Sequence, residues 1–347
     1  MISRLLLPLA VLLAGLTPVA ARDLTVISWG GNFQDAQRKA YFAPFTTETG
    51  LKVVDDSWEG GVGALRSRAE AAGDPGWDVV HVEIEELQIG SAEGLFEPID
   101  WSKIAARDEL IPSAHNKFGV GAITWSAGVA YDADKYKSGP SPSTVADFFD
   151  VRKFPGKRAI RKGPKYALEL ALIGDGVPVA DVYKVLSTQE GVDRAFKKLS
   201  TIKKDLIFFE SGGQAIQLLA SGEASLVLAF NGRVTAANQS DKRNFRFIWP
   251  GSIYALDNWV ILKNSPNKEA ALKFIDFASR AKQQEILPQF VAYGPTNTVA
   301  TAALPENVVK ELPTYPKNLV GALQVDAAFW TENIEPLTER FNAFAAQ

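Results

Sequence analysis

The sequence predicts an α/β protein of two lobes, with mixed sheets flanked by helices and a hinged cleft between the lobes. Strand-like and helix-like segments alternate in two separate regions, which is typical of parallel strands joined by helices. Two β-rich connectors, residues 122–136 and 253–264, lie between and after these regions. The length of 347 residues is also better matched by two lobes than by one.

The first alternation begins at LTVISW, residues 24–29, where alternating β-branched residues predict a strand. Residues 32–50 carry apolar side chains at helical spacing and stop at a glycine. A strand at 51–58, a helix at 61–71 and a strand at 77–83 complete the pattern β-α-β-α-β. This order predicts a parallel sheet with helices on both faces.

The second alternation begins with the predicted strand 157–162 and the helix 166–176. The strand LIFFE leads into the predicted helix 211–223, where the spacing of Ser211 and Gln214 fits a capping box. The apolar run 224–232 is then predicted to be a strand that ends in Phe-Asn-Gly. A second α/β unit is therefore expected here.

Because two connectors join two α/β units, the chain is expected to cross from lobe one to lobe two and to return. We predict that lobe one comprises residues 22–129 and 257–298, and that lobe two comprises residues 130–256 and 299–347. The tail should form a closing helix, since four large apolar residues recur there at helical spacing: Phe329, Ile334, Leu337 and Phe341.

Residues 1–21 have the pattern of a cleavable secretory signal peptide. One early Arg4 precedes a leucine-rich run that is too short to span a membrane, and small residues lead to predicted cleavage after Ala21. The sequence contains no cysteine, so neither disulfides nor a lipid-anchored cysteine is expected. The predicted location is the bacterial periplasm, without a lipid anchor.

Composition excludes several classes of function. The net charge of −3 comes with no basic stripe, so nucleic-acid binding is not expected. The two histidines, His81 and His115, lack partners at metal-ligand spacing, and we expect neither a metal nor another cofactor. A hydrolase acting through Glu83 and Glu85, which share one face of an extended strand, stays open as a weak alternative to binding.

Ligands of open α/β sheets bind beyond the carboxyl ends of the strands. Here those ends are Trp29-Gly30-Gly31, Glu83-Ile84-Glu85, Phe209-Glu210-Ser211 and Phe230-Asn231-Gly232. The first of them, in SWGGNF, lacks both G-x-x-x-x-G-K-[ST] and G-x-G-x-x-G, which argues against a phosphate loop. Its glycines allow close approach to the backbone, and Trp29 offers a flat apolar face.

Several stretches resemble the periplasmic spermidine/putrescine-binding proteins of ABC importers, over essentially the whole chain after the signal. They include SWGGNF, WDVV, LASGEASLVLAFNG, ALDNWVILKNSPNKEAALKFIDF and AYGPTN. The resemblance implies a type II periplasmic-binding fold, a monomer, no enzymatic activity, and delivery of a small amine-bearing ligand to an inner-membrane ABC permease. A chemoreceptor is an alternative partner.

The family holds its ligand in an aromatic box with acidic residues that bind the amines. By resemblance, Trp29, Phe230 and Tyr293 correspond to box aromatics, and Asp257 corresponds to a carboxylate that binds an amine. Glu83 lies at a lobe-one strand end and is added to this set. Further candidates at or just after the strand ends are Gly30, Asn32, Glu85, Arg161, Lys162, Tyr166 and Ser211, and a loose alignment with a late polar contact of the family adds Gln324.

Two departures from the family pattern affect the expected ligand. Where polyamine binders carry acidic residues, this sequence reads RKGPKY at 161–166, and Ala255 replaces a family tryptophan, which is expected to widen the box. A polyamine remains the main hypothesis. The alternative is a zwitterion such as γ-aminobutyrate, an amino acid or an opine-like conjugate. Its amine would bind Glu83 and Asp257, and its carboxylate would bind Arg161, Lys162 or the N–H groups at Ser211-Gly212-Gly213.

Overall fold

The computed structural model describes residues 22–347, and the predicted signal peptide lies outside them. Within this range the strands form one eleven-stranded mixed sheet with the central order β2-β1-β3-β9-β4-β7-β5-β6. The strands are β1 Leu24–Ser28, β2 Val53–Ser57, β3 Val79–Val82, β4 Gly119–Asp132, β5 Lys157–Arg161, β6 Leu206–Phe209, β7 Ala224–Phe230, β8 Phe245–Phe247, β9 Ile253–Ile261, β10 Gly294–Pro295 and β11 Leu323–Gln324.

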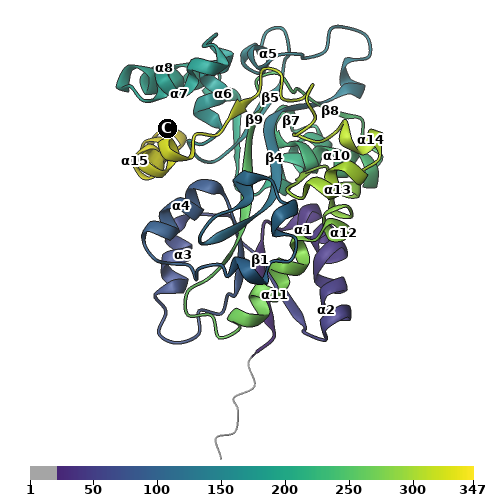
Figure 1. Ribbon diagram of the computed structural model, residues 1–347. Coiled ribbons are helices and arrows are strands. Elements are labelled where there is room, and N and C mark those ends of the chain that lie inside the picture. The colour runs from purple at the N-terminus through teal and green to yellow at the C-terminus, as the bar shows by residue number, and fades with distance from the viewer. Residues whose placement is uncertain (1–21) are drawn as a thin grey trace, which may run out of the picture.

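Each end of the sheet carries helices and forms one lobe, so the predicted α/β class is confirmed (Figure 1). Around β1–β3, lobe one carries α1 Gly31–Gln37, α2 Ala43–Thr49, α3 Val62–Ala69, α4 Ile84–Ala92 and α11 Lys268–Ser279. Around β5–β7, lobe two carries α5 Val145–Phe149, α6 Ala167–Gly174, α7 Val182–Leu186, α8 Gln189–Ser200, α9 Gly212–Ser221 and α10 Asn231–Ser240. The remaining helices are α12 Ala281–Gln284, α13 Thr298–Ala303, α14 Glu306–Val309 and α15 Ala327–Ala346.

The two predicted connectors are the long strands β4 and β9, which pair antiparallel and run from one lobe to the other (Figure 1). On either side of them β1 pairs parallel with β2 and β3, and β5 pairs parallel with β6 and β7. The predicted residue limits of the two lobes stay a prediction. The carboxyl ends of β1, β3, β5 and β7 turn toward the space between the lobes, which positions the site described below.

Most other predicted elements occur with small shifts. The helix predicted at 32–50 is continuous from α1 to α2 through a π-helical turn at Arg38–Phe42, and it ends before Gly50, whose φ of 73° suits glycine. The Ser211–Gln214 capping box is present at the start of α9. The predicted closing helix is α15, which buries Phe329, Trp330, Leu337, Phe341 and Phe344.

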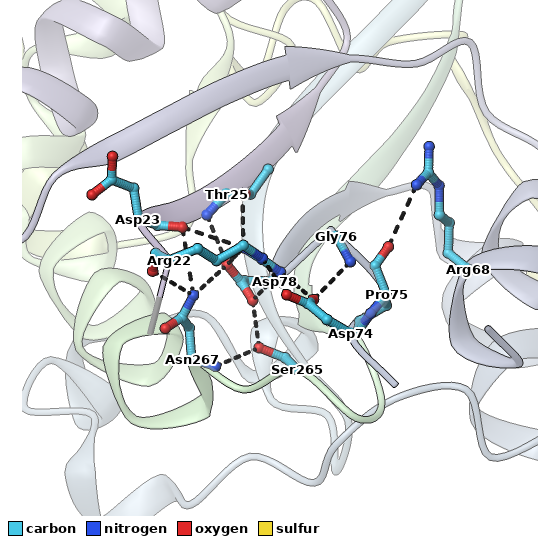
Figure 2. A network of polar contacts seen from close by, with 10 residues as sticks. All are labelled: Arg22, Asp23, Thr25, Arg68, Asp74, Pro75, Gly76, Asp78, Ser265 and Asn267. Carbon is cyan, nitrogen blue, oxygen red and sulfur yellow. Dashed lines mark hydrogen bonds and ion pairs between the residues drawn. The ribbon is translucent and has the colours of Figure 1, made fainter. Parts of the chain in front are cut away.

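A polar network ties the start of the described chain to lobe one (Figure 2). Arg22 forms ion pairs with Asp74 and Asp78, both at 2.6 Å. Asp78 is fully buried and also accepts hydrogen bonds from Ser265 and Asn267, which precede α11. The network lies at the amino ends of β1 and β3, and so it joins the returning segment to lobe one on the side away from the strand ends that carry the candidate residues.

Candidate functional site

An aromatic chamber with charged side chains lies between the lobes. We call it the inner chamber. Its lining residues are Trp29, Phe33, Glu59, Glu83, Ile123, Trp125, Arg161, Gly212, Phe230, Arg233, Asp257 and Tyr293. The structure therefore brings together all five principal candidates: Trp29, Glu83, Phe230, Asp257 and Tyr293. Only about 30 Å³ of free space is left in the chamber, which describes a nearly closed arrangement, and we expect the lobes to open to admit an organic solute.

The aromatic walls come from both lobes and from the strands between them. The ring of Trp125 meets that of Phe230 edge to face at 5.3 Å, and Phe33 meets Tyr293 at 5.1 Å. Trp125 lies directly opposite Ala255 in the β4–β9 register. The wider box expected from Ala255 stays a prediction, and the strand opposite supplies the indole of Trp125 to the wall of the chamber.

Asp257 on β9 is an acidic group in the wall of the chamber. Its carboxylate is 4% exposed, and Oδ1 accepts a hydrogen bond of 2.6 Å from Trp125 Nε1. Among residues 22–347 no lysine or arginine nitrogen lies within 4 Å of it. Burial, followed by the nearby charge of Glu83, raises the pKa of Asp257 well above its usual range. An ammonium group placed here would stabilise the ionised form.

His81 contacts Asp257 but contributes no positive charge to it. Burial lowers the pKa of His81 to about 3, so the imidazole is neutral. Its Nδ1 accepts a hydrogen bond of 2.7 Å from Trp29 Nε1 and is 3.3 Å from Asp257 Oδ2. The ring fixes the orientation of the Trp29 indole, which lines the chamber and stacks on Trp58.

Arg233 on α10 is a buried cation, and among the described residues no carboxylate is paired with it. Its guanidinium donates to the carbonyl oxygens of Trp29 at 2.7 Å and Gly30 at 3.3 Å, and to Asn32 Oδ1 at 3.4 Å. The residue is 4% exposed, and within residues 22–347 no carboxylate oxygen lies within 4 Å of it. Burial lowers its pKa, but a guanidinium stays charged in proteins.

The start of α9 lies against the Arg233 side chain. A Cβ atom built on Gly212 would be 2.6 Å from Arg233 Nε, so the absence of a side chain leaves room for the guanidinium. Gly212 is the first residue of the helix and lines the chamber, which places the positive end of the helix dipole there. The anion-binding N–H groups expected at 211–213 thus lie beside an arginine that we did not predict.

Glu83 lines the chamber, but its charge is already paired inside the protein. Lys165 Nζ lies 2.5 Å from Glu83 Oε2 and 2.5 Å from Glu85 Oε1, and the Tyr166 hydroxyl donates to Glu83 Oε2 at 2.7 Å. Burial alone raises the pKa of Glu83, but the charges of Lys165 and Arg161 outweigh it and lower the pKa to about 2. This pairing differs from the expectation that Glu83 would hold the ligand amine.

A larger hollow of about 650 Å³, which we call the vestibule, adjoins the chamber and shares Trp29, Glu59, Glu83 and Arg161 with it. Three further candidates, Glu85, Lys162 and Tyr166, line the vestibule rather than the chamber.

The other candidates lie at different distances from the chamber. Arg161 reaches across the lobes to donate to the Glu59 carbonyl at 2.6 Å, whereas Lys162 is exposed beside Glu210. Gly30 and Asn32 contact Arg233, and Ser211 caps α9. Gln324 is exposed on β11 and lines neither hollow.

The sequence reasoning missed Arg233, Trp125 and the role of Lys165. Arg233 directly follows the strand-end turn Phe230-Asn231-Gly232, and an arginine one residue beyond such a turn is the signal that could have identified it. Trp125 and Lys165 had weaker signals, because their roles depend on contacts with Asp257, Glu83 and Glu85 far away in the sequence.

Two further observations concern metal binding and membrane spans. Among residues 22–347 no group of three or more histidine, aspartate or glutamate side chains is arranged to hold a metal ion. Within the same range the helices are too short or too polar to cross a membrane.

Comparison with known proteins gives consistent matches along the chain. The profile of the bacterial extracellular solute-binding protein family matches residues 40–317. A γ-aminobutyric acid-binding protein of Pseudomonas aeruginosa is 43% identical over 94% of this chain and 92% of its own. A solved structure of a GABA receptor is 34% identical, with a TM-score of 0.81 over 94% of this chain and 98% of its own. The spermidine/putrescine-binding periplasmic protein of Salmonella typhimurium is 24% identical over 90% of both chains.

Proposed function

The chain belongs to the bacterial extracellular solute-binding protein family, and we propose that it captures a small solute carrying both an ammonium and a carboxylate group. The chain is a periplasmic substrate-binding protein of ABC transport and is not an enzyme. The proposed ligand class is that of γ-aminobutyrate. The loaded protein would then deliver the solute to an inner-membrane ABC permease.

The single observation that carries this proposal is the charge pattern of the inner chamber. Asp257, whose pKa burial raises, and Arg233 are both 4% exposed, would ionise with opposite charges, and have no lysine, arginine or carboxylate partner within 4 Å among the described residues. An unpaired buried charge is costly unless a partner neutralises it. A ligand with one ammonium and one carboxylate supplies both missing partners.

The rest of the chamber suits the part of the ligand between its charged ends. The rings of Trp29, Trp125, Phe230 and Tyr293 offer apolar faces to methylene groups. An ammonium near such a face gains about 0.5–2 kcal/mol from cation–π attraction. The hydrogen bonds to Asp257 and Arg233 would fix the orientation, since charge-assisted bonds are stronger and more directional than neutral ones.

A polyamine fits this charge pattern less well. Its second ammonium would enter a space that already contains Arg233, Arg161 and the nearby Lys165, and like charges at close range repel. The relatives point the same way, since the γ-aminobutyrate-binding relative is 43% identical and the polyamine-binding relative 24%. The zwitterion is therefore the better supported of the two hypotheses for the ligand.

Isothermal titration calorimetry tests the proposal. Residues 22–347 are purified, unfolded in guanidinium to remove co-purified solute, refolded and titrated with γ-aminobutyrate, β-alanine, common amino acids, putrescine and spermidine. We expect an ω-amino acid to bind and the polyamines not to bind. Asp257→Asn and Arg233→Gln should each lower affinity about 30-fold or more, because each leaves the opposite ligand charge unpaired.

Circular dichroism and thermal melting of both variants provide the folding control. Binding of polyamines alone by the parent protein would refute the proposal. Unchanged affinity in a folded Asp257→Asn protein would remove Asp257 from the site.

A further inference from the structure

We propose that Lys165 determines selectivity, because its own ammonium occupies the position where the second ammonium of a diamine would otherwise bind. The inference rests on the proposed function only in taking the inner chamber as the ligand site. It adds that the cleft has two cation positions, one left for the ligand and one filled by the protein.

The contacts around Lys165 are those of a bound alkylammonium ion. Nζ lies 2.5 Å from one oxygen of Glu83 and 2.5 Å from one oxygen of Glu85, and it lies 5.0 Å from the centre of the Tyr166 ring. The three charged residues are each at most 7% exposed. A carboxylate, a second carboxyl group and an aromatic face are surroundings that proteins provide for ammonium ligands.

This cation position is continuous with the ligand site. Glu83 lines the inner chamber together with Asp257, and it also lines the vestibule together with Glu85 and Lys165. Of the three carboxylates that line the chamber, Glu83 is paired with Lys165 and Glu59 lies near the charges of Arg161 and Arg233, whereas Asp257 has no lysine or arginine nitrogen within 4 Å among residues 22–347. The cleft therefore has room for one external ammonium group.

The backbone at Tyr166 has an unusual conformation that places Lys165 against the two glutamates. Tyr166 adopts φ 69°, ψ −37°, a conformation that residues with a side chain rarely adopt. The next residue begins α6, so the turn directs both Lys165 and the Tyr166 hydroxyl toward Glu83. Such unusual backbone persists where the surrounding contacts require it, and it is concentrated at ligand sites.

A simple interlobe latch is the competing explanation, because Lys165 belongs to lobe two and the two glutamates belong to lobe one. The two explanations differ in one measurable respect. Loss of a latch would lower the affinity for every ligand to a similar extent. An emptied cation position would instead raise the affinity for ligands that carry a second ammonium group.

Calorimetry with Lys165→Ala tests the inference. The titrants are γ-aminobutyrate, the α,ω-diamines with three to five carbons, and methylammonium chloride as a probe of the emptied position. We expect affinity for at least one diamine to rise about 10- to 100-fold over the parent protein, the range of one charge-assisted hydrogen bond. Millimolar methylammonium should strengthen γ-aminobutyrate binding in the variant and not in the parent protein.

Two further proteins make the outcome decisive. The double variant Lys165→Ala/Glu85→Gln removes one of the two carboxylates left without a cation, so it keeps the test available if the single variant does not fold. It should show the same gain through Glu83. Lys184→Met, which changes an exposed lysine on α7, should bind like the parent protein.

The outcomes separate the two proposals. A folded Lys165→Ala or double variant that gains no diamine affinity and shows no methylammonium effect overturns the role of Lys165, even if γ-aminobutyrate binds. A gain of diamine binding in a protein that never binds ω-amino acids supports Lys165 and refutes the proposed ligand.

Discussion

Gly212, at the start of α9, shapes the end of the chamber where a ligand carboxylate would bind. Gly212 has a φ that any residue can adopt, so its backbone does not require glycine. What requires it is space, because a Cβ atom placed on Gly212 would lie only 2.6 Å from Arg233 Nε. At the neighbouring Gly213 the nearest atom to such a Cβ is Ser211 Oγ, at 3.9 Å. Gly212 lies close to Arg233 and lines the chamber, whereas Gly213 does neither.

Gly212→Ala should lower affinity for a ligand that bears a carboxylate about tenfold, because the new methyl group displaces the guanidinium from its position. Gly213→Ala is the matched control and should leave affinity within about twofold, since its Cβ meets no close neighbour. Calorimetry with γ-aminobutyrate measures both. Equal losses in the two variants would assign the effect to the helix terminus rather than to Arg233.

The junction between β3 and α4 concentrates negative charge in one short element. Glu83 ends the strand region, and Glu85 and Glu86 lie in the first turn of α4, where the helix dipole favours carboxylates. Lys165 contacts only the first two. Burial, followed by the charge of Glu83, raises the pKa of Glu86 to about 7, and both oxygens of Glu86 accept backbone hydrogen bonds from Gly61 and Glu83.

Glu85 makes the stability of this element depend on pH. Burial raises the pKa of Glu85 to about 8, with Lys165 opposing the shift and Glu83 and Glu86 adding to it. A carboxyl group that holds its proton more tightly in the folded state contributes stability below its unfolded pKa of about 4.3, and the contribution is lost as pH rises toward 8.

Glu85→Gln should therefore melt at a temperature that falls less between pH 5.5 and 8.5 than that of the parent protein, by about 2 °C or more. Differential scanning calorimetry at several pH values gives the comparison, and groups common to both proteins cancel in the difference. Parallel pH profiles for the two proteins would show that Glu85 is ionised throughout this range.

At the scale of the whole molecule, three contacts around the chamber link the two lobes. Lys165 pairs with Glu83, Arg161 donates to the Glu59 carbonyl, and Arg233 donates to the Trp29 carbonyl. These contacts surround a chamber of about 30 Å³, whereas β4 and β9 are the strands that run through from one lobe to the other (Figure 1). Closure by a bend in these strands is the motion that a ligand bound to both lobes would favour.

Small-angle X-ray scattering should show a smaller radius of gyration when γ-aminobutyrate is added to the refolded parent protein, because a ligand that contacts both lobes shifts the population toward the closed form. Asp257→Asn at the same ligand concentration should show no change. A parent protein that is equally compact with and without bound ligand would show that the closed form already predominates.

The local elements followed from the sequence because short-range patterns specify them. The alternation at 24–83, the capping box at Ser211 and the apolar spacing of the tail each depend on residues close together in the chain, and each element is present. The strand-end rule also placed Trp29, Glu83 and Phe230 in one site, with Asp257 and Tyr293 added by resemblance. Gln324, placed by a loose alignment, lies outside it.

By itself the sequence determined the α/β class and which strand ends carry aromatic and acidic residues. Only the tertiary structure decided which charges are paired. Glu83 and Asp257 are both acidic residues of the predicted site, yet one lies 2.5 Å from Lys165, 82 residues away, and the other has no lysine or arginine nitrogen within 4 Å among residues 22–347. Arg233 likewise became part of the site only when α10 packed against lobe one. Whether a buried charge is satisfied depends on distances of a few ångströms between remote segments, and no local pattern records them.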